Sequence, residues 1–168
     1  EQRLLWLNGA HIRALGLDEL FEMSKGFWPK EAAASDDEYK KKVLALVQER
    51  VKFFKELPAL TLFFFKDLPV DLDLIDTNKQ LAKFDKNKLK DLLQQTETSL
   101  GQSDFSADDL AKRLNELLGS TEQKPSVLFS LIRIATTQAP ASPGLAETMS
   151  VVGKEICLRR IDAQLSKL

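Results

Sequence analysis

The chain has almost none of the side chains that disulfides and metal sites require. Its 168 residues include a single cysteine, Cys157, and a single histidine. One cysteine cannot form an internal disulfide, which is typical of a reducing compartment, and these two side chains are too few soft ligands for a structural zinc site. We therefore expect a cytoplasmic protein with no metal centre.

Long apolar segments are also missing. The longest nearly apolar run, 57–65, contains Pro58 and Thr61 and is far too short to cross a bilayer. No charged segment followed by an apolar one opens the chain, so we expect neither secretion nor a membrane partner. The chain begins at Glu1, directly in a helical pattern, and we interpret it as part of a longer protein.

The sequence has no large excess of charge of one sign. It holds 24 Lys and Arg against 25 Asp and Glu, for a formal net charge of −1. Only residues 124–168 are clearly basic, with 6 Lys and Arg against 3 Asp and Glu. Such a local excess indicates a surface that faces a polyanion or, about equally well, a solvated helix face. Charge alone therefore does not identify a nucleic-acid partner.

What the chain does have is helical periodicity almost from end to end, with no convincing alternation of period two. In the first half, Ser35 and Glu38 form a capping box that predicts a long helix to about Glu56, broken by Pro58. The stretch 59–65 fits a short helix or a buried strand. The pattern predicts an all-α protein.

The second half shows the same pattern. Helices are predicted to begin at Ser106, at Pro125 and at Leu145, and the last of these stops near Gly153 before a final helix. The two prolines within 138–144 predict an ordered loop or turn there.

Four segments, taken in order, carry a resemblance to a known family. They are Leu5-Trp6-Leu7-Asn8-Gly9-Ala10-His11-Ile12-Arg13, then Glu49-Arg50-Val51-Lys52 leading to Lys55-Glu56-Leu57-Pro58, then Leu131-Ile132-Arg133-Ile134-Ala135, and finally Ser142-Pro143-Gly144-Leu145 followed by Gly153-Lys154-Glu155. Over essentially the whole chain, this set resembles the C-terminal half of bacterial-type glutamyl-tRNA synthetase, a class I aminoacyl-tRNA synthetase. Each motif alone is weak, whereas the ordered set is specific.

The resemblance implies an all-α cage or bundle without a catalytic Rossmann domain, in which 59–65 is helical. Helical periodicity is interrupted at 68–78, and the family divides its helical region in the same way. We therefore expect two small helical subdomains. Residues 1–72 would form the first anticodon-binding subdomain, which also contacts the tRNA stem, and residues 73–168 would form the C-terminal anticodon-binding subdomain.

The function that the resemblance implies is recognition of the anticodon of tRNA(Glu). The parent would be a glutamate–tRNA ligase of protein biosynthesis, whose catalytic domain uses ATP and Mg²⁺ and lies outside this chain. For the chain itself we expect no catalytic residue, no cofactor, no DNA partner and a monomeric state. The alternative is a helical protein–protein interaction domain without RNA binding, which the near-neutral charge would suit.

Arg50 is the first residue that we single out. It falls on the apolar stripe of the helix predicted to run to Glu56, where an unpaired charge would be expensive to bury. Its aliphatic stem can also lie along the edge of the stripe with the charged head in water. The resemblance implies that Arg50 reads the third anticodon base, since a guanidinium fork can bind a pyrimidine carbonyl and exclude a larger purine.

Arg133 and the turn at Ser142, Pro143, Gly144 and Leu145 form the second predicted part of the anticodon site. From the residues alone, these are an arginine near a helix end and a tight turn into the next helix. The resemblance implies that Arg133 helps to bind the anticodon and that the turn lies against its first base. The chain departs from the family at 136–138, where Thr-Thr-Gln replaces the usual Leu-Thr-Gly.

Trp6, Asn8 and Arg13 belong to the opening motif, which the family uses against the tRNA stem. Trp6 on a short helix is otherwise a core residue, and a phosphate contact by Arg13 is plausible chemistry. A further segment, Glu22-Met23-Ser24-Lys25-Gly26, imitates the Lys-Met-Ser-Lys-Ser signature of class I synthetases. It follows the opening motif instead of preceding it, and we interpret the match as chance.

Overall fold

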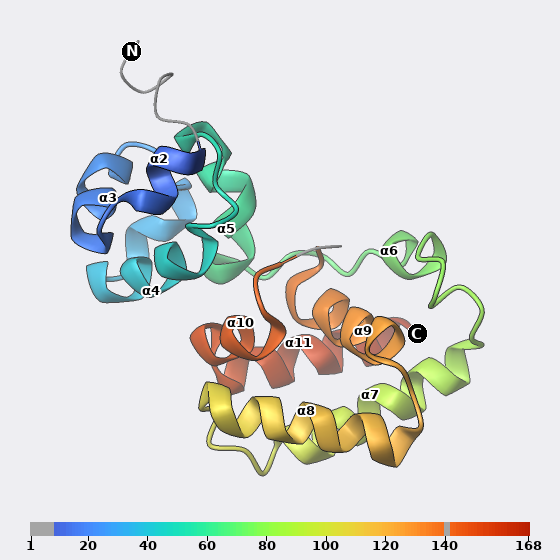
Figure 1. Cartoon of the computed structure of the whole chain (residues 1–168). Helices are drawn as coiled ribbons and strands as arrows, with labels where there is room; N and C mark the ends of the chain where they lie inside the picture. The colour runs from blue at the N-terminus through green and yellow to red at the C-terminus, as the bar shows by residue number, and fades with distance from the viewer. Residues whose placement is uncertain (1–8, 140–141) are drawn as a thin grey trace. The chain divides into compact units, whose positions relative to one another are not determined.

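The computed structural model describes residues 9–139 and 142–168, with side chains from residue 12 onward, and every regular element in these ranges is a helix (Figure 1). The predicted all-α class is confirmed. The chain divides into two compact units, Glu1–Lys66 and Asp67–Leu168, called unit 1 and unit 2 below. This division falls a few residues before the predicted one at 72/73, and the separate roles given to 1–72 and 73–168 stay a prediction.

Unit 1 is a cluster of short helices in which α4 packs against both α3 and α5. Its elements are α2 (Gly9–Ala14), α3 (Leu17–Ser24), the 3₁₀ helix η1 (Lys30–Ala34), α4 (Asp37–Val47), the 3₁₀ helix η2 (Phe54–Glu56) and α5 (Leu57–Phe65). Aromatic side chains fill the space between them: the ring of Phe65 meets Trp28 and Tyr39 edge to face, with centroids 5.8 and 5.7 Å away. These half-buried rings border a core in which aliphatic side chains outnumber aromatic ones.

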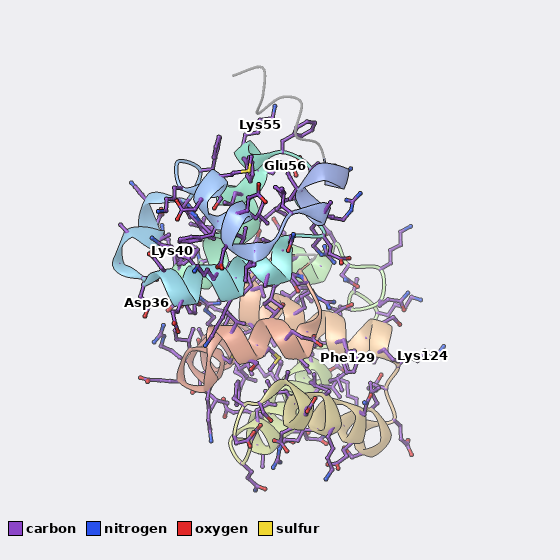
Figure 2. The ribbon with its side chains drawn as sticks, turned by 60° about the vertical axis from the view of Figure 1, so that its left-hand side comes forward. Asp36, Lys40, Lys55, Glu56, Lys124 and Phe129 are labelled. Atoms are coloured by element: carbon purple, nitrogen blue, oxygen red, sulfur yellow. The ribbon has the colours of Figure 1, made fainter. Side chains whose placement is uncertain are left out.

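The long helix predicted from Ser35 to about Glu56 is wrong, because α4 ends at Val47. Its N-cap is Asp36, whose carboxylate accepts a hydrogen bond from the amide of Tyr39 at 2.8 Å. Asp36 and Lys40 mark this first turn in Figure 2. Capping by an aspartate satisfies a free amide of the first turn, as the predicted Ser35 would have done. At its C-terminal end, α4 gives way to the turn that carries Gln48 and Arg50.

The stretch from Leu57 to Phe65 is helical, as the resemblance predicted. Pro58 lies in its first turn and starts a helix instead of breaking one, since a first-turn residue needs no amide donor. The hydroxyl of Tyr39 on α4 donates to the carbonyl oxygen of Phe64 at 2.7 Å, near the end of α5. This bond satisfies one of the carbonyls that a helix leaves open at its C-terminus.

Unit 2 is a bundle in which α11 packs against α7 and α9, and α10 packs against α8. Its elements are α6 (Asp73–Asp76), α7 (Lys86–Leu100), α8 (Ala107–Thr121), α9 (Pro125–Thr137), α10 (Leu145–Val152) and α11 (Lys154–Lys167). The helix starts predicted at Ser106, Pro125 and Leu145 are confirmed, and Ser106 caps α8 by accepting from the amide of Asp109. Gly153 joins α10 to α11 with φ +102°, a conformation that a side chain would strain.

Helix α7 had no counterpart in the sequence analysis, although its signals are ordinary ones. Asp85 caps it by accepting from the amide of Lys88 at 2.8 Å. Its buried side chains follow helical spacing and are Leu89, Leu92, Leu93, Thr96 and Leu100. The helix supplies one wall of the unit 2 core, against α8, α9 and α11.

Candidate nucleic-acid interface

Arg50 lies on the turn that follows α4, and its side chain is exposed. The premise that it stands on a buried stripe is therefore wrong, and no desolvation cost demands a partner for it. Its backbone amide donates to the carbonyl oxygen of Val47 at 2.8 Å. Within the described residues, no hydrogen bond or ion pair engages its guanidinium, whose donors face solvent. Its predicted contact with the third anticodon base stays a prediction.

The turn that carries Arg50 is anchored from beneath. The side-chain amide of Gln48 donates to the carbonyl oxygens of Ile12 and Leu15, both at 2.9 Å. Val51 is 1% exposed, and the ring of Phe54 stacks on that of Phe27 with centroids 5.3 Å apart. These contacts fasten the turn to α2 and to the core of unit 1. The exposed arginine thus projects from a fixed backbone.

Arg133 is held in a different way. It lies on the last turns of α9, half-buried, and its Nε donates to Oγ of Ser142 at 2.8 Å. The Ser142 hydroxyl in turn donates to the carbonyl oxygen of Pro143 at 2.9 Å. The structure therefore brings together Arg133 and the predicted turn, which are nine residues apart in the chain.

The predicted turn presents little side-chain surface. Ser142, Pro143 and Leu145 are buried, and only Gly144 is exposed. Because these three side chains are buried, the exposed part of the turn is Gly144, and Arg133 beside it is half-buried. Backbone groups at such a turn can bind the edge of an unpaired base.

The end of α9 is fixed by Gln138, which occupies the position where the resembled family has glycine. Its backbone has φ +53°, in the left-handed region that glycine favours at helix ends. Its side-chain oxygen accepts from the amide of Asp71 at 3.0 Å, and its amide nitrogen donates to Oε1 of Gln164 at 2.9 Å. These two hydrogen bonds offset the strain of a non-glycine residue in this conformation.

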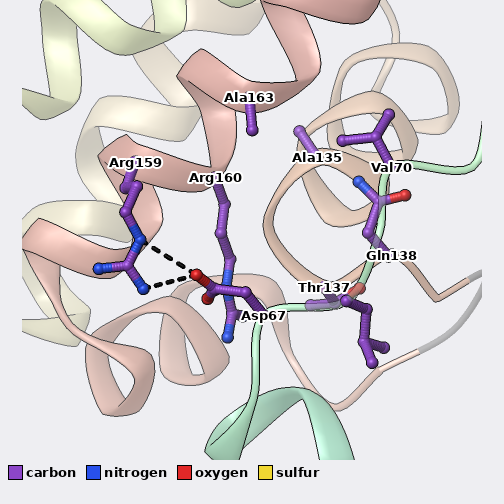
Figure 3. A pocket seen from close by; sticks show the side chains of 9 residues that line it. Asp67, Val70, Ala135, Thr137, Gln138, Arg159, Arg160 and Ala163 are labelled. Carbon is purple, nitrogen blue, oxygen red and sulfur yellow. Dashed lines mark hydrogen bonds and ion pairs between the residues drawn. The ribbon is translucent and has the colours of Figure 1, made fainter.

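A small cavity of about 110 Å³ lies beside the same helix end, between α9, α11 and the segment after Lys66 (Figure 3). Asp67 stands at its rim, where Oδ2 accepts from Arg159 at 2.7 and 3.1 Å and Oδ1 accepts from Nε of Arg160 at 2.9 Å. The Arg160 guanidinium also donates to the carbonyl oxygen of Thr136 at 2.7 Å. Burial raises the pKa of the Asp67 carboxyl, but the hydrogen bonds from Arg160 and Arg159 outweigh it and the net pKa is lowered.

The sequence analysis did not single out Arg160, and the structure gives it a role. Arg160 is 8% exposed, and its two charge-assisted hydrogen bonds tie α11 to the end of α9 and to Asp67. An arginine on an otherwise apolar helix face is the signal that finds such a residue. Its partner was not predictable, because Asp67 is 93 residues away in the chain.

A pair of carboxyl groups, Glu97 of α7 and Asp162 of α11, lies where these two helices pack. A hydrogen bond that protonated Glu97 donates to Asp162, together with burial and the negative charge of Asp162, raises the pKa of Glu97 to about 7. Two neighbouring carboxyl groups share a proton more readily than they ionise together.

The remaining predicted residues divide into two groups. Arg13 is exposed on α2, whereas Trp6 and Asn8 lie outside the described residues.

Ser24, within the segment that imitates a synthetase signature, is buried at the end of α3. Its hydroxyl donates to the carbonyl oxygen of Phe21 at 2.8 Å and accepts from Nε1 of Trp28 at 3.2 Å. The segment is a packed helix end, in agreement with a chance match.

No group of three or more His, Cys, Asp or Glu in the described part of the chain is placed to hold a metal ion. No helix there has the length and the apolar composition to cross a membrane.

Comparison with known proteins assigns the class. Residues 18–165 match the family model described as an anticodon binding domain, and the chain belongs to that family. A glutamate–tRNA ligase of Dehalococcoides mccartyi is 34% identical over 99% of this chain and 35% of its own length, and one of Symbiobacterium thermophilum is 32% identical over 95% and 33%. The chain thus spans about a third of the length of the curated relatives it matches.

A solved structure has the same fold. The crystal structure of a glutamate tRNA ligase from Elizabethkingia meningosepticum superposes with a TM-score of 0.79 at 18% identity, over 97% of this chain and 32% of that one.

Proposed function

We propose that this chain is the anticodon-binding part of a glutamate–tRNA ligase of the cytoplasm and that its partner is tRNA(Glu). The observation that carries the proposal is the 34% identity over 99% of the chain with a ligase of which it covers only about a third. The parent would couple glutamate to the tRNA with ATP and Mg²⁺ in a domain outside this chain. The chain itself would act as a monomer.

The two anchored surfaces suit this role in different ways. Unit 1 presents Arg50 from a fixed turn, and a planar guanidinium with five donors suits a base edge or a phosphate. Unit 2 presents Arg133 and the backbone of Gly144, with the supporting side chains buried beneath. Groups held on rigid elements bind unpaired bases without first paying the entropy of their own ordering.

The experiment is a binding titration of the 168-residue chain with a tRNA(Glu) transcript, followed by footprinting. Protection of anticodon nucleotides is expected. A transcript with the same acceptor stem but a scrambled anticodon loop is the matched control and should bind much more weakly. Protection confined to the acceptor stem would overturn the placement of the site, and no binding to either RNA would favour a protein–protein interaction domain.

A further inference from the structure

Phe53 is an unusual residue on the surface of unit 1. Of the large apolar side chains in the described ranges, it alone is exposed, with 36% of its surface accessible. A lone exposed phenylalanine requires no explanation by itself. Phe53, however, follows directly after the turn that carries Arg50, and this position indicates a role in binding.

The backbone fixes the ring outward. Phe53 has an extended conformation, φ −139° and ψ 144°, and its carbonyl oxygen accepts from the amide of Glu56 at 3.0 Å. Val51, two positions before it, and Phe54, directly after it, are 1% and 3% exposed, because both face the core of unit 1. Successive side chains of an extended segment point to opposite sides, so the Phe53 ring lies on the side away from the buried Phe54.

Cationic residues lie close to Phe53 in the chain. Arg50, Lys52 and Lys55 are all exposed, and the ammonium of Lys55, labelled in Figure 2, lies 5.6 Å from the centroid of the Phe53 ring. Within the described residues, none of these three side chains is engaged in a salt bridge, although Glu49 and Glu56 lie in the same segment. The segment therefore offers a flat apolar face together with three unpaired positive charges.

We infer that Phe53 is a stacking platform for an unpaired RNA base, with the neighbouring cations binding the phosphates on either side. Single-stranded nucleic acid alternates flat bases with phosphates, and proteins bind it with aromatic rings set among cations. A protein partner is a poorer match, because the centres of protein interfaces are depleted of lysine and this ring is flanked by two. The inference rests on the proposed function and adds a residue to its site.

The test uses the 168-residue chain and the anticodon stem–loop of tRNA(Glu), with affinity measured by fluorescence anisotropy. Stacking on one base contributes about 1–3 kcal/mol, so Phe53→Ala should weaken binding about 5- to 150-fold. Phe53→Tyr keeps the ring and should bind as the unchanged chain does. Phe53→Leu keeps an apolar side chain but removes the ring, and it should lose most of the affinity. Equal melting temperatures for the four proteins would exclude misfolding as the cause.

A second arm locates the base. Stem–loops that carry one abasic nucleotide at a time are titrated against the unchanged chain and Phe53→Leu. At the stacked position alone, the difference between the two proteins should vanish, because the base that the ring needs is gone.

Two results overturn the inference while leaving the proposed function intact. One is binding of the stem–loop that Phe53→Ala leaves unchanged, and the other is full affinity in Phe53→Leu. Failure of the unchanged chain to bind the stem–loop would remove the proposed function, and this inference with it.

Discussion

The two arginines predicted to meet the anticodon differ in how the molecule holds them. Arg50 of unit 1 projects from a turn whose backbone is fixed while its side chain stays exposed. Arg133 of unit 2 is fixed through the side chain itself, by its hydrogen bond to Ser142. An exposed guanidinium group can reorient toward a base at little cost, whereas a guanidinium group that is already hydrogen-bonded to the protein offers only some of its donors to a ligand. The contrast suggests base reading in unit 1 and positioning of a turn in unit 2.

The largest effect that we expect is a loss of stability in unit 2 when Asp67 is replaced. Asp67→Ala leaves the buried Arg160 without its carboxylate, and stranding a buried charge is costly. We expect a loss of about 2–3 kcal/mol in the free energy of unfolding, less than for a wholly buried pair because the Asp67 side chain is half-exposed. Thermal and urea denaturation measure it. Arg159→Met is the matched control, since Arg159 is exposed and such pairs contribute about 0–1 kcal/mol. Equal losses would show that Arg160 is not the residue that needs Asp67.

Arg50→Gln should act on RNA and leave the stability unchanged, in contrast to Asp67→Ala. If Arg50 reads the third anticodon base, the preference for cytosine over guanine there should fall by about 2 kcal/mol, by analogy with one bidentate base contact in DNA. Titrating stem–loops with either base measures it, and a melting curve should coincide with that of the unchanged chain. A loss of affinity that is equal for both bases, with a shallower salt dependence, would indicate a phosphate contact instead.

Helix starts that depend on local chemistry could be predicted from the sequence. Ser106 and Pro125 act within one turn of their own position, so their meaning survives folding. The position of the turn after α4 could not be predicted, because the side chain of Gln48 holds it through hydrogen bonds to carbonyls more than thirty residues away. For the same reason the exposure of Arg50 and the burial of Ser142 escaped the pattern. The resemblance indicated which residues belong together, and only the structure shows which face they present.

The carboxyl pair of unit 2 makes its stability depend on pH. The pKa of Glu97 is raised from 4.5 to about 7, so between these values the folded chain binds more protons than the unfolded chain. The stabilisation is complete below pH 4.5 and is lost as the pH rises through 7. We expect a loss on the order of 1–2 kcal/mol across this window, discounted for the partial exposure of the pair. Glu97→Gln should flatten the dependence, measured by urea denaturation at several pH values, whereas Glu116→Gln, a nearby exposed control, should not.

The smallest effect tests how Gln138 replaces the glycine of the resembled pattern. Gln138→Ala removes the hydrogen bonds to Asp71 and Gln164 and keeps a side chain at φ +53°. Gln138→Gly removes the same bonds and also relieves the strain, which costs about 1–2 kcal/mol for a residue other than glycine. The glycine variant should therefore have the larger free energy of unfolding, measured by urea denaturation. We expect a difference of about 1 kcal/mol, less than the full strain, because glycine also has more freedom in the unfolded chain. Equal stabilities would mean that the strain at the end of α9 is no larger than the entropy that glycine loses on folding. If the glycine variant is as stable as the unchanged chain, the two side-chain hydrogen bonds of Gln138 stabilise the fold by no more than its backbone strain destabilises it.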